Sequence, residues 1–165
     1  MFAHSPGFLI AASLLLGAVS GMRTMLPPAV LALTLSRRPE LVPSVDPAQW
    51  FTHGAVAIVL CIAALGELVG DKLPQIPNRT ALGPFAGRVL SGAICGAALV
   101  QIGGMNAWTG ASCGAAGAAA STIGMFHLRR YAGRVTKIRD PWIGAVEDVI
   151  AITIAATVMA MTVTP

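Results

Sequence analysis

Residues 8–35 read FLIAASLLLGAVSGMRTMLPPAVLALTL, an apolar stretch that is interrupted by Arg23 and by a pair of prolines. A straight helix of this length would measure about 42 Å at 1.5 Å per residue, whereas the hydrocarbon core of a bilayer is about 30 Å thick. Pro27 and Pro28 have no N–H to donate to the carbonyls of Arg23 and Thr24. We therefore predict a first transmembrane helix that is kinked or broken at this point.

The composition of the whole chain is that of a membrane protein. Of the 165 residues 55% are hydrophobic and only 11% are charged, whereas soluble domains average about 25% charged residues. Mean hydropathy is +0.74. These values exclude a disordered chain and argue against a water-soluble domain. No Lys or Arg precedes the first apolar run, so we interpret it as a retained span rather than a signal peptide.

Four further apolar segments predict additional spans, at about residues 54–70, 85–102, 109–126 and 141–163. We expect residues 1–165 to form a single all-α transmembrane domain with about five helices. The alternative is four full spans plus a re-entrant segment at Pro27 and Pro28. At both ends of the chain a glycine-rich helix precedes an acidic one, which suggests an inverted repeat.

The distribution of basic residues predicts an orientation. Eight of the 11 Lys and Arg residues lie in or beside the loops that follow the second and fourth spans: Lys72, Arg79, Arg88, Arg129, Arg130, Arg134, Lys137 and Arg139. The loop after the first span holds only Arg37 and Arg38. Cytoplasmic loops carry the excess of basic residues, so we expect the N-terminus inside and the C-terminus outside.

Part of this basic group lies directly after the fourth span and forms a cluster. Basic residues in that position attract anionic lipid head groups, so we expect such an interaction at Arg129, Arg130, Arg134, Lys137 and Arg139. The alternative is that the cluster serves topology selection alone.

Several ionisable residues fall within the predicted spans, where they are costly and mark either function or internal pairing. We expect Arg23 to pair with one of four carboxylates, with Glu67 as first choice because consecutive elements are usually neighbours; the other three are Asp71, Glu147 and Asp148. The candidates for a substrate or ion site are Arg23, Thr24, Glu67, Asp71, Glu147 and Asp148. The competing interpretations are a structural ion pair, a transport site and a catalytic site.

No catalytic or metal-binding motif accompanies these residues. The chain has no HExxH, GxGxxG or P-loop sequence. The three cysteines (Cys61, Cys95, Cys113) and three histidines (His4, His53, His127) are scattered without metal-ligand spacing. We therefore expect neither enzyme activity nor a cofactor or metal. We also expect no nucleic-acid binding, because no aromatic-rich basic surface is evident.

Pairs of glycines four residues apart occur in each of the first four spans: Gly17/Gly21, Gly66/Gly70, Gly92/Gly96 and Gly110/Gly114. This GxxxG spacing puts both glycines on one helix face and lets helices approach closely. We expect tight packing within the bundle or, as the alternative, a homo-oligomer through one of these faces.

Three segments resemble the signatures of a known family. They are SGMRTMLPPA at residues 20–29, GELVGDKLP with PNRT at 66–80, and EDVIAI at 147–152. The chain resembles a family of small bacterial inner-membrane proteins known only as a domain of unknown function. The resemblance implies a location in the bacterial inner membrane and brings no activity with it.

Taken with the polar residues, these features favour a small transporter or channel whose site is built from a broken helix and buried carboxylates. The alternative function is a non-catalytic membrane scaffold or assembly partner. We expect the lipid bilayer as surroundings and a small solute or ion, which the sequence does not identify, as ligand.

Overall fold

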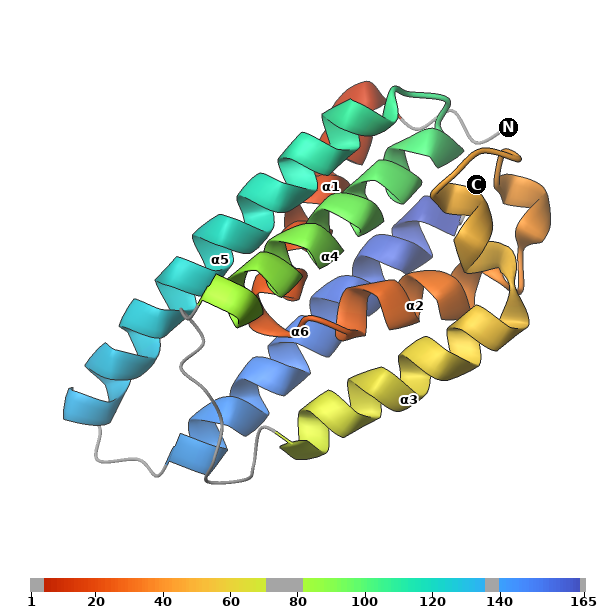
Figure 1. Cartoon of the computed structure of the whole chain (residues 1–165). Coiled ribbons are helices and arrows are strands. Elements are labelled where there is room, and N and C mark those ends of the chain that lie inside the picture. Colours follow the sequence, from red (N-terminus) through yellow and green to blue (C-terminus); the bar gives the residue numbers. More distant parts are fainter. Residues whose placement is uncertain (1–4, 71–81, 136–139, 164–165) are drawn as a thin grey trace.

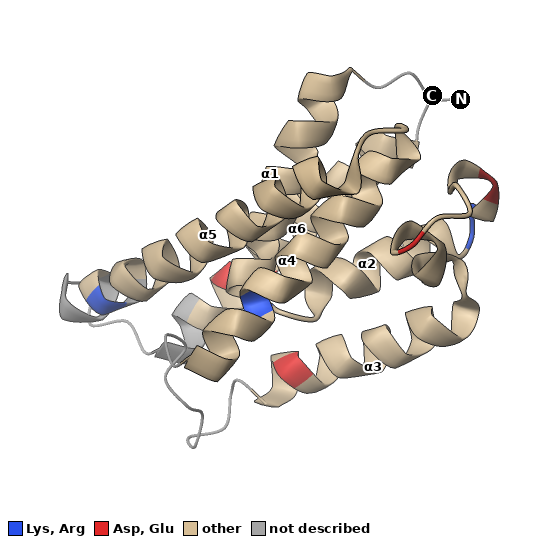
Figure 2. Ribbon diagram, turned by 45° about the horizontal axis from the view of Figure 1, so that its top comes forward, with Lys and Arg blue, Asp and Glu red and all other residues tan. Residues whose placement is uncertain are grey.

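A computed structural model describes residues 5–70, 82–135 and 140–163. Over these ranges the protein is all-α, with six α-helices, two short 3-10 helices and no strand (Figure 1). The helices are α1 (Pro6–Met22), α2 (Leu26–Leu35), η1 (Pro39–Leu41), η2 (Ala48–Thr52), α3 (Gly54–Gly70), α4 (Leu82–Ile102), α5 (Ala107–Val135) and α6 (Asp140–Val163). Charged residues are sparse along them (Figure 2).

The predicted break in the first helix is present. Helix α1 ends at Met22 and α2 begins at Leu26, so residues 23–25 form a short non-helical connection. The two prolines lie in the first turn of α2, where the amide N–H has no partner within the helix and its loss does no harm. The prolines therefore start the second helix, and the break lies just before them.

Helix α1 runs into the bundle alongside α4. At its start, Leu9 lies against Gly103, beyond the C-terminal end of α4. One turn further along, the Ser13 hydroxyl donates to the carbonyl of Gly96 at 3.3 Å. At the break, the hydroxyl of Ser91, which lies in the middle of α4, donates to the Thr24 carbonyl in the connection. The contacts on α4 thus move from its C-terminal end to its centre.

Helix α2 then returns to the end of the bundle where α1 began. The segment after α2 is bound by Gln101, near the C-terminal end of α4. The Gln101 side chain accepts from the Ala48 N–H at 3.2 Å and donates to the Asp46 carbonyl at 2.8 Å. Together α1 and α2 form a helical hairpin that enters and leaves at one end, with residues 23–25 as its tip (Figure 1).

The C-terminal part of α6 lies beside the start of α1. A cavity of about 330 Å³ is lined by Phe8 and Ala12 of α1 together with Thr157 and Met161 of α6. Both ends of the described chain therefore lie at the same end of the bundle. Residues 6–35 thus form two helices that double back at residues 23–25 instead of one continuous helix, and the number of membrane crossings stays a prediction.

The centre of the bundle is a close crossing of α1, α4 and α5. A Cβ atom added at Gly17 would fall on the carbonyl of Gly114, and one added at Gly96 would fall on the carbonyl of Gly110. Large apolar side chains such as Leu16 and Leu99 fill the remaining space. Helix α3, by contrast, packs mainly on α2 and η2 at the edge of the bundle.

One local prediction requires correction. Helix α5 continues to Val135, nine residues beyond the predicted end at 126, so part of the predicted basic loop is helical. The segment 127–135 has no proline and contains good helix formers such as Leu, Arg and Ala. Phe51 is buried in the core, whereas its neighbour Trp50 is half-exposed.

By length and composition alone, two helical segments are apolar and long enough to cross a membrane: Leu82–Ile102 and Gly144–Val163. Three further apolar helices are shorter: Pro6–Met22, Leu26–Leu35 and Gly54–Gly70. The helices are therefore compatible with a membrane-associated protein.

Candidate functional site at the hairpin tip

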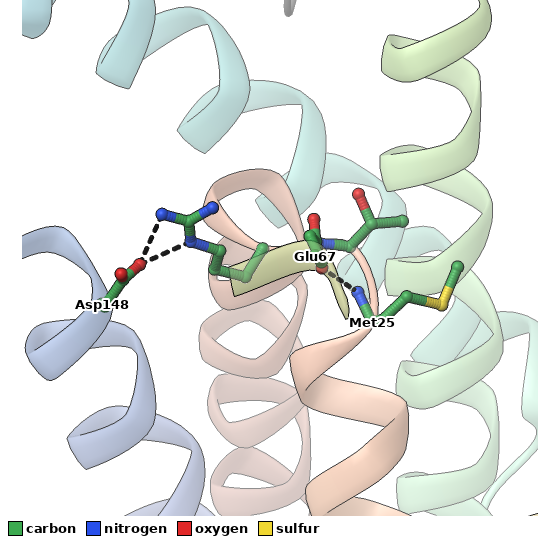
Figure 3. A network of polar contacts seen from close by, with 5 residues as sticks. Met25, Glu67 and Asp148 are labelled. Atoms are coloured by element: carbon green, nitrogen blue, oxygen red, sulfur yellow. Dashed lines mark hydrogen bonds and ion pairs between the residues drawn. The ribbon is translucent and has the colours of Figure 1, made fainter. Parts of the chain in front are cut away.

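Side chains from four other helices converge on the tip of the α1–α2 hairpin, and Figure 3 shows two of them, Glu67 and Asp148. The carboxylates come from α3 and α6, and the hydroxyl groups come from α4 and α5. Because a helix end exposes unpaired N–H and C=O groups, a break inside a packed bundle needs such partners. The tip therefore makes hydrogen bonds with side chains from α3, α4, α5 and α6.

An ion pair anchors Arg23 to α6. The Arg23 Nε donates to Asp148 Oδ1 at 2.6 Å, and Nη2 lies 2.5 Å from the same oxygen. Both side chains are buried. Arg23 also follows the last residue of α1, where the negative end of the helix dipole favours a cation. Removing one partner of such a buried pair leaves an uncompensated charge.

The carboxylate of Glu67 binds the other side of the tip. Its Oε1 accepts the N–H of Thr24 and its Oε2 accepts the N–H of Met25, both at 2.7 Å. These N–H groups lie at the start of α2, where the positive end of the helix dipole favours an anion. Glu67 comes from α3, 42 residues further along the chain than Met25. A distant acidic residue thus caps α2 in place of a local Ser, Thr or Asp.

Hydroxyl groups satisfy the carbonyls that the break sets free. The Ser91 Oγ donates to the Thr24 carbonyl at 2.6 Å and lies 3.3 Å from the Ser20 Oγ. The Thr24 carbonyl would accept from residue 28 in an unbroken helix, and residue 28 is a proline. On the opposite side, Thr122 of α5 donates to the carbonyl of Gly21 at 3.3 Å.

Comparison with known proteins assigns the family. The family model "Domain of unknown function (DUF4126)" matches residues 10–164. The chain belongs to this family. The resemblance noted in the sequence to a family of unknown function is therefore confirmed. No curated protein and no solved structure matches the chain.

In this DUF4126 protein, four of the six candidate site residues meet at the tip: Arg23, Thr24, Glu67 and Asp148. Glu147 is 2% exposed and lies beside Asp148 on α6. Asp71 lies outside the described residues. The partner of Arg23 in the ion pair is Asp148, whereas the sequence favoured Glu67. The difference follows from the hairpin. Because α3 packs on α2, the Glu67 carboxylate reaches the N–H groups at the start of α2 and not the Arg23 guanidinium.

Two polar residues of this site, Ser91 and Thr122, were not singled out from the sequence. Ser91 and Thr122 are small hydroxyl residues in apolar helices, which usually bond to their own helix, so their type alone does not reveal a distant partner. Arg88 was counted among the basic residues flanking a loop, but it is 6% exposed and buried, one turn before Ser91 on α4. Its spacing from Ser91, three residues on a helix, is the signal that places both on one face.

The basic cluster after the fourth predicted span is described only in part. Arg130 is exposed near the C-terminal end of α5. Lys137 and Arg139 lie outside the described residues, and so do the side chains of Arg129 and Arg134. Binding of lipid head groups by these residues stays a prediction. Over the described part of the chain no group of three or more His, Cys, Asp or Glu is arranged to hold a metal ion.

Proposed function

We propose that this DUF4126 protein is a polytopic membrane transport protein whose ion or solute site is the tip of the α1–α2 hairpin. One observation carries the proposal: the Glu67 carboxylate holds both N–H groups at the start of a broken helix, directly beside the buried Arg23–Asp148 pair. Transporters commonly build their sites from such interrupted helices, with half-helix ends and ionisable side chains facing each other.

The depth of the tip supports this function. From Ile102 at the end of α4 to Ser91 the helix rises about 16 Å at 1.5 Å per residue. A hydrocarbon core is about 30 Å thick. If the ends of α4 lie near the two membrane surfaces, the hairpin tip is close to the midplane. Charged groups at that depth serve either transport or internal pairing.

The two carboxylates have different surroundings, which suggests different roles. Asp148 is buried and bound to Arg23, so the pair holds α1 against α6. Glu67 is half-buried and binds only backbone N–H groups in its two hydrogen bonds at the tip. Protonation of Glu67 would replace one acceptor oxygen by a donor and weaken its hold on α2. We infer that Glu67 is the group that exchanges a proton or another cation.

The hairpin changes the expected orientation. Arg130, the described member of the basic cluster, lies near the C-terminal end of α5, at the end of the bundle opposite both described termini. If this basic end is cytoplasmic, as the positive-inside rule requires, both termini lie on the outer side of the inner membrane. The sequence predicted a cytoplasmic N-terminus because it counted residues 8–35 as a crossing. In this orientation we expect the basic cluster, Arg130 included, to attract anionic head groups.

A second function, a non-catalytic membrane scaffold, is favoured by a different observation. The contacts of the tip, from the Arg23–Asp148 pair to the Ser91 and Thr122 hydrogen bonds, join groups of the protein to one another. A network of this kind is also what a purely structural core requires.

The deciding experiment measures proton and monovalent-cation flux in proteoliposomes. We expect flux by the wild-type protein and its loss in Glu67→Gln, which keeps the side-chain size and removes the charge. The matched control is Glu40→Gln, because Glu40 is exposed on η1 outside the tip. Wild-type flux in Glu67→Gln would remove Glu67 from the transport path. No flux in correctly folded wild-type protein would leave the scaffold function.

A further inference from the structure

A cavity of about 380 Å³ lies beside the hairpin tip, between α2, η2, α3 and α4. Its walls are almost entirely apolar, and the residues that matter most here are Pro28, Trp50, Phe51, Leu60, Leu90 and Ile94. Its size falls within the range of small-molecule sites, about 300–1,000 Å³. Neither the ion pair nor the Glu67 contact of the proposed function occupies this space.

The chemistry of the lining excludes a charged ligand. None of the described residues that line the cavity is charged. Two of its residues, Thr24 and Ser91, carry hydroxyl groups, and the Ser91 hydroxyl is already engaged because it donates to the Thr24 carbonyl. An ion that entered would lose its hydration without gaining a partner of opposite charge, which is strongly unfavourable. The ligand of this cavity is therefore apolar.

The approach to the cavity is apolar as well. Trp50 is 52% exposed and Leu90 is 62% exposed, so both lining side chains also face the outside of the bundle. On α3, the neighbouring wall, Ile58, Val59 and Ile62 are each more than 60% exposed. A molecule that reaches the cavity from this side crosses hydrocarbon-like surface, as the chain of a membrane lipid does.

We propose that the cavity holds one acyl chain of a bilayer phospholipid, packed against the hairpin tip. The chain would contact Met25 and Pro28 at the start of α2, and the Met25 N–H is one of the two backbone groups that Glu67 binds. This inference rests on the membrane placement within the proposed function and is independent of transport. It adds a lipid ligand to the tip, alongside the ion or solute.

The chain offers a matched pair of variants on α4. Gly87 lines the cavity, and a Cβ atom added there would meet no described atom within 4 Å. Gly87→Phe should therefore fill the cavity without disturbing its walls. Gly83 lies one turn earlier on the same helix, is equally open, and does not line the cavity. Gly83→Phe is the control for an added aromatic side chain.

The measurement uses Trp50 as a reporter inside the cavity wall. In a background of Trp108→Phe and Trp142→Phe, phospholipid with brominated acyl chains is titrated into the detergent-solubilised protein, and quenching of Trp50 fluorescence is recorded. We expect quenching that saturates at a low lipid fraction. Gly87→Phe should abolish this saturating phase, and Gly83→Phe should retain it.

Other results would overturn the proposal. Quenching that rises only in proportion to the lipid fraction would mean bulk lipid around Trp50, and a saturating phase that persists in Gly87→Phe would place the lipid elsewhere. Saturation by a brominated free fatty acid but not by phospholipid would reject the phospholipid as ligand. Absence of the protein from the cell membrane fraction would remove the shared basis of both proposals. Loss of transport with intact quenching would remove transport alone.

Discussion

Helices α1, α4 and α5 cross so closely that several positions have room only for glycine, whereas the Gly66/Gly70 pair of α3 meets no described atom. At the central crossing, a Cβ atom on Gly17, Gly92 or Gly114 would fall on a neighbouring backbone carbonyl. On α3, a Cβ atom on Gly66 or Gly70 would find nothing within 4 Å among the described residues. Both regions have the same four-residue spacing of glycines, but among the described residues only the central crossing brings another backbone against them.

The difference separates a fixed part of the bundle from a loosely attached one. Backbone-to-backbone contact leaves α1, α4 and α5 little freedom to slide. Helix α3 packs mainly on α2 and η2, and the Glu67 carboxylate ties it to the hairpin tip. The apolar cavity also lies between α3 and α4. The Glu67 contact and the apolar cavity therefore both lie beside α3, the helix that we expect to move at the lowest cost in free energy.

The largest effect is expected at the central crossing. Gly114→Leu should destabilise the bundle by more than about 5 kcal/mol, the range of exceptional single substitutions. Its Cβ would fall on the carbonyl of Gly92 and lie 3.3 Å from the Cα of Gly96. These are backbone atoms that cannot rotate away, and overpacking forces backbone shifts. The measurement is recovery of folded protein by fluorescence-detected size exclusion and its thermal unfolding in detergent.

An intermediate effect is expected where the hairpin tip meets α6. Arg23→Ala should destabilise the protein by about 3–5 kcal/mol, because it leaves Asp148 buried without its ion-pair partner. The double variant Arg23→Met, Asp148→Leu should lose less than Arg23→Ala, since both charges are then removed. Chemical unfolding in detergent measures the three free energies. Equal losses in the single and double variants would mean that the pair contributes nothing beyond packing.

Much of this fold was predictable from the sequence, because apolar runs and prolines act locally. The missing N–H groups of Pro27 and Pro28 predicted the break, and the apolar segments predicted helices near each observed position. The direction of the chain after the break was not predictable. It depends on Ser13 and Gln101, whose partners lie 83 residues and more than 50 residues away in the sequence. Contacts at such separation leave no periodic signal.

The candidate site was predictable in its members and not in its pairing. A charged residue inside an apolar run is conspicuous, so Arg23, Glu67 and Asp148 were found from residue type and position alone. Which carboxylate meets the guanidinium depends on the relative placement of three helices. The inverted repeat, the solute and the oligomeric state stay predictions.

The smallest effect is expected on α3, and it completes the comparison with Gly114. Gly66→Leu introduces the same side chain at the same type of glycine pair, but a Cβ atom there meets no described atom. Leucine favours helix over glycine by up to about 1 kcal/mol, and exposed substitutions usually lie within about 0.5 kcal/mol of neutral. We therefore expect unchanged or slightly raised stability, with unchanged mass in light scattering of the purified protein. A loss above about 1 kcal/mol together with a lower mass would show that a second copy covers this face, and the contrast between the two regions would then lie in the partner rather than in the packing.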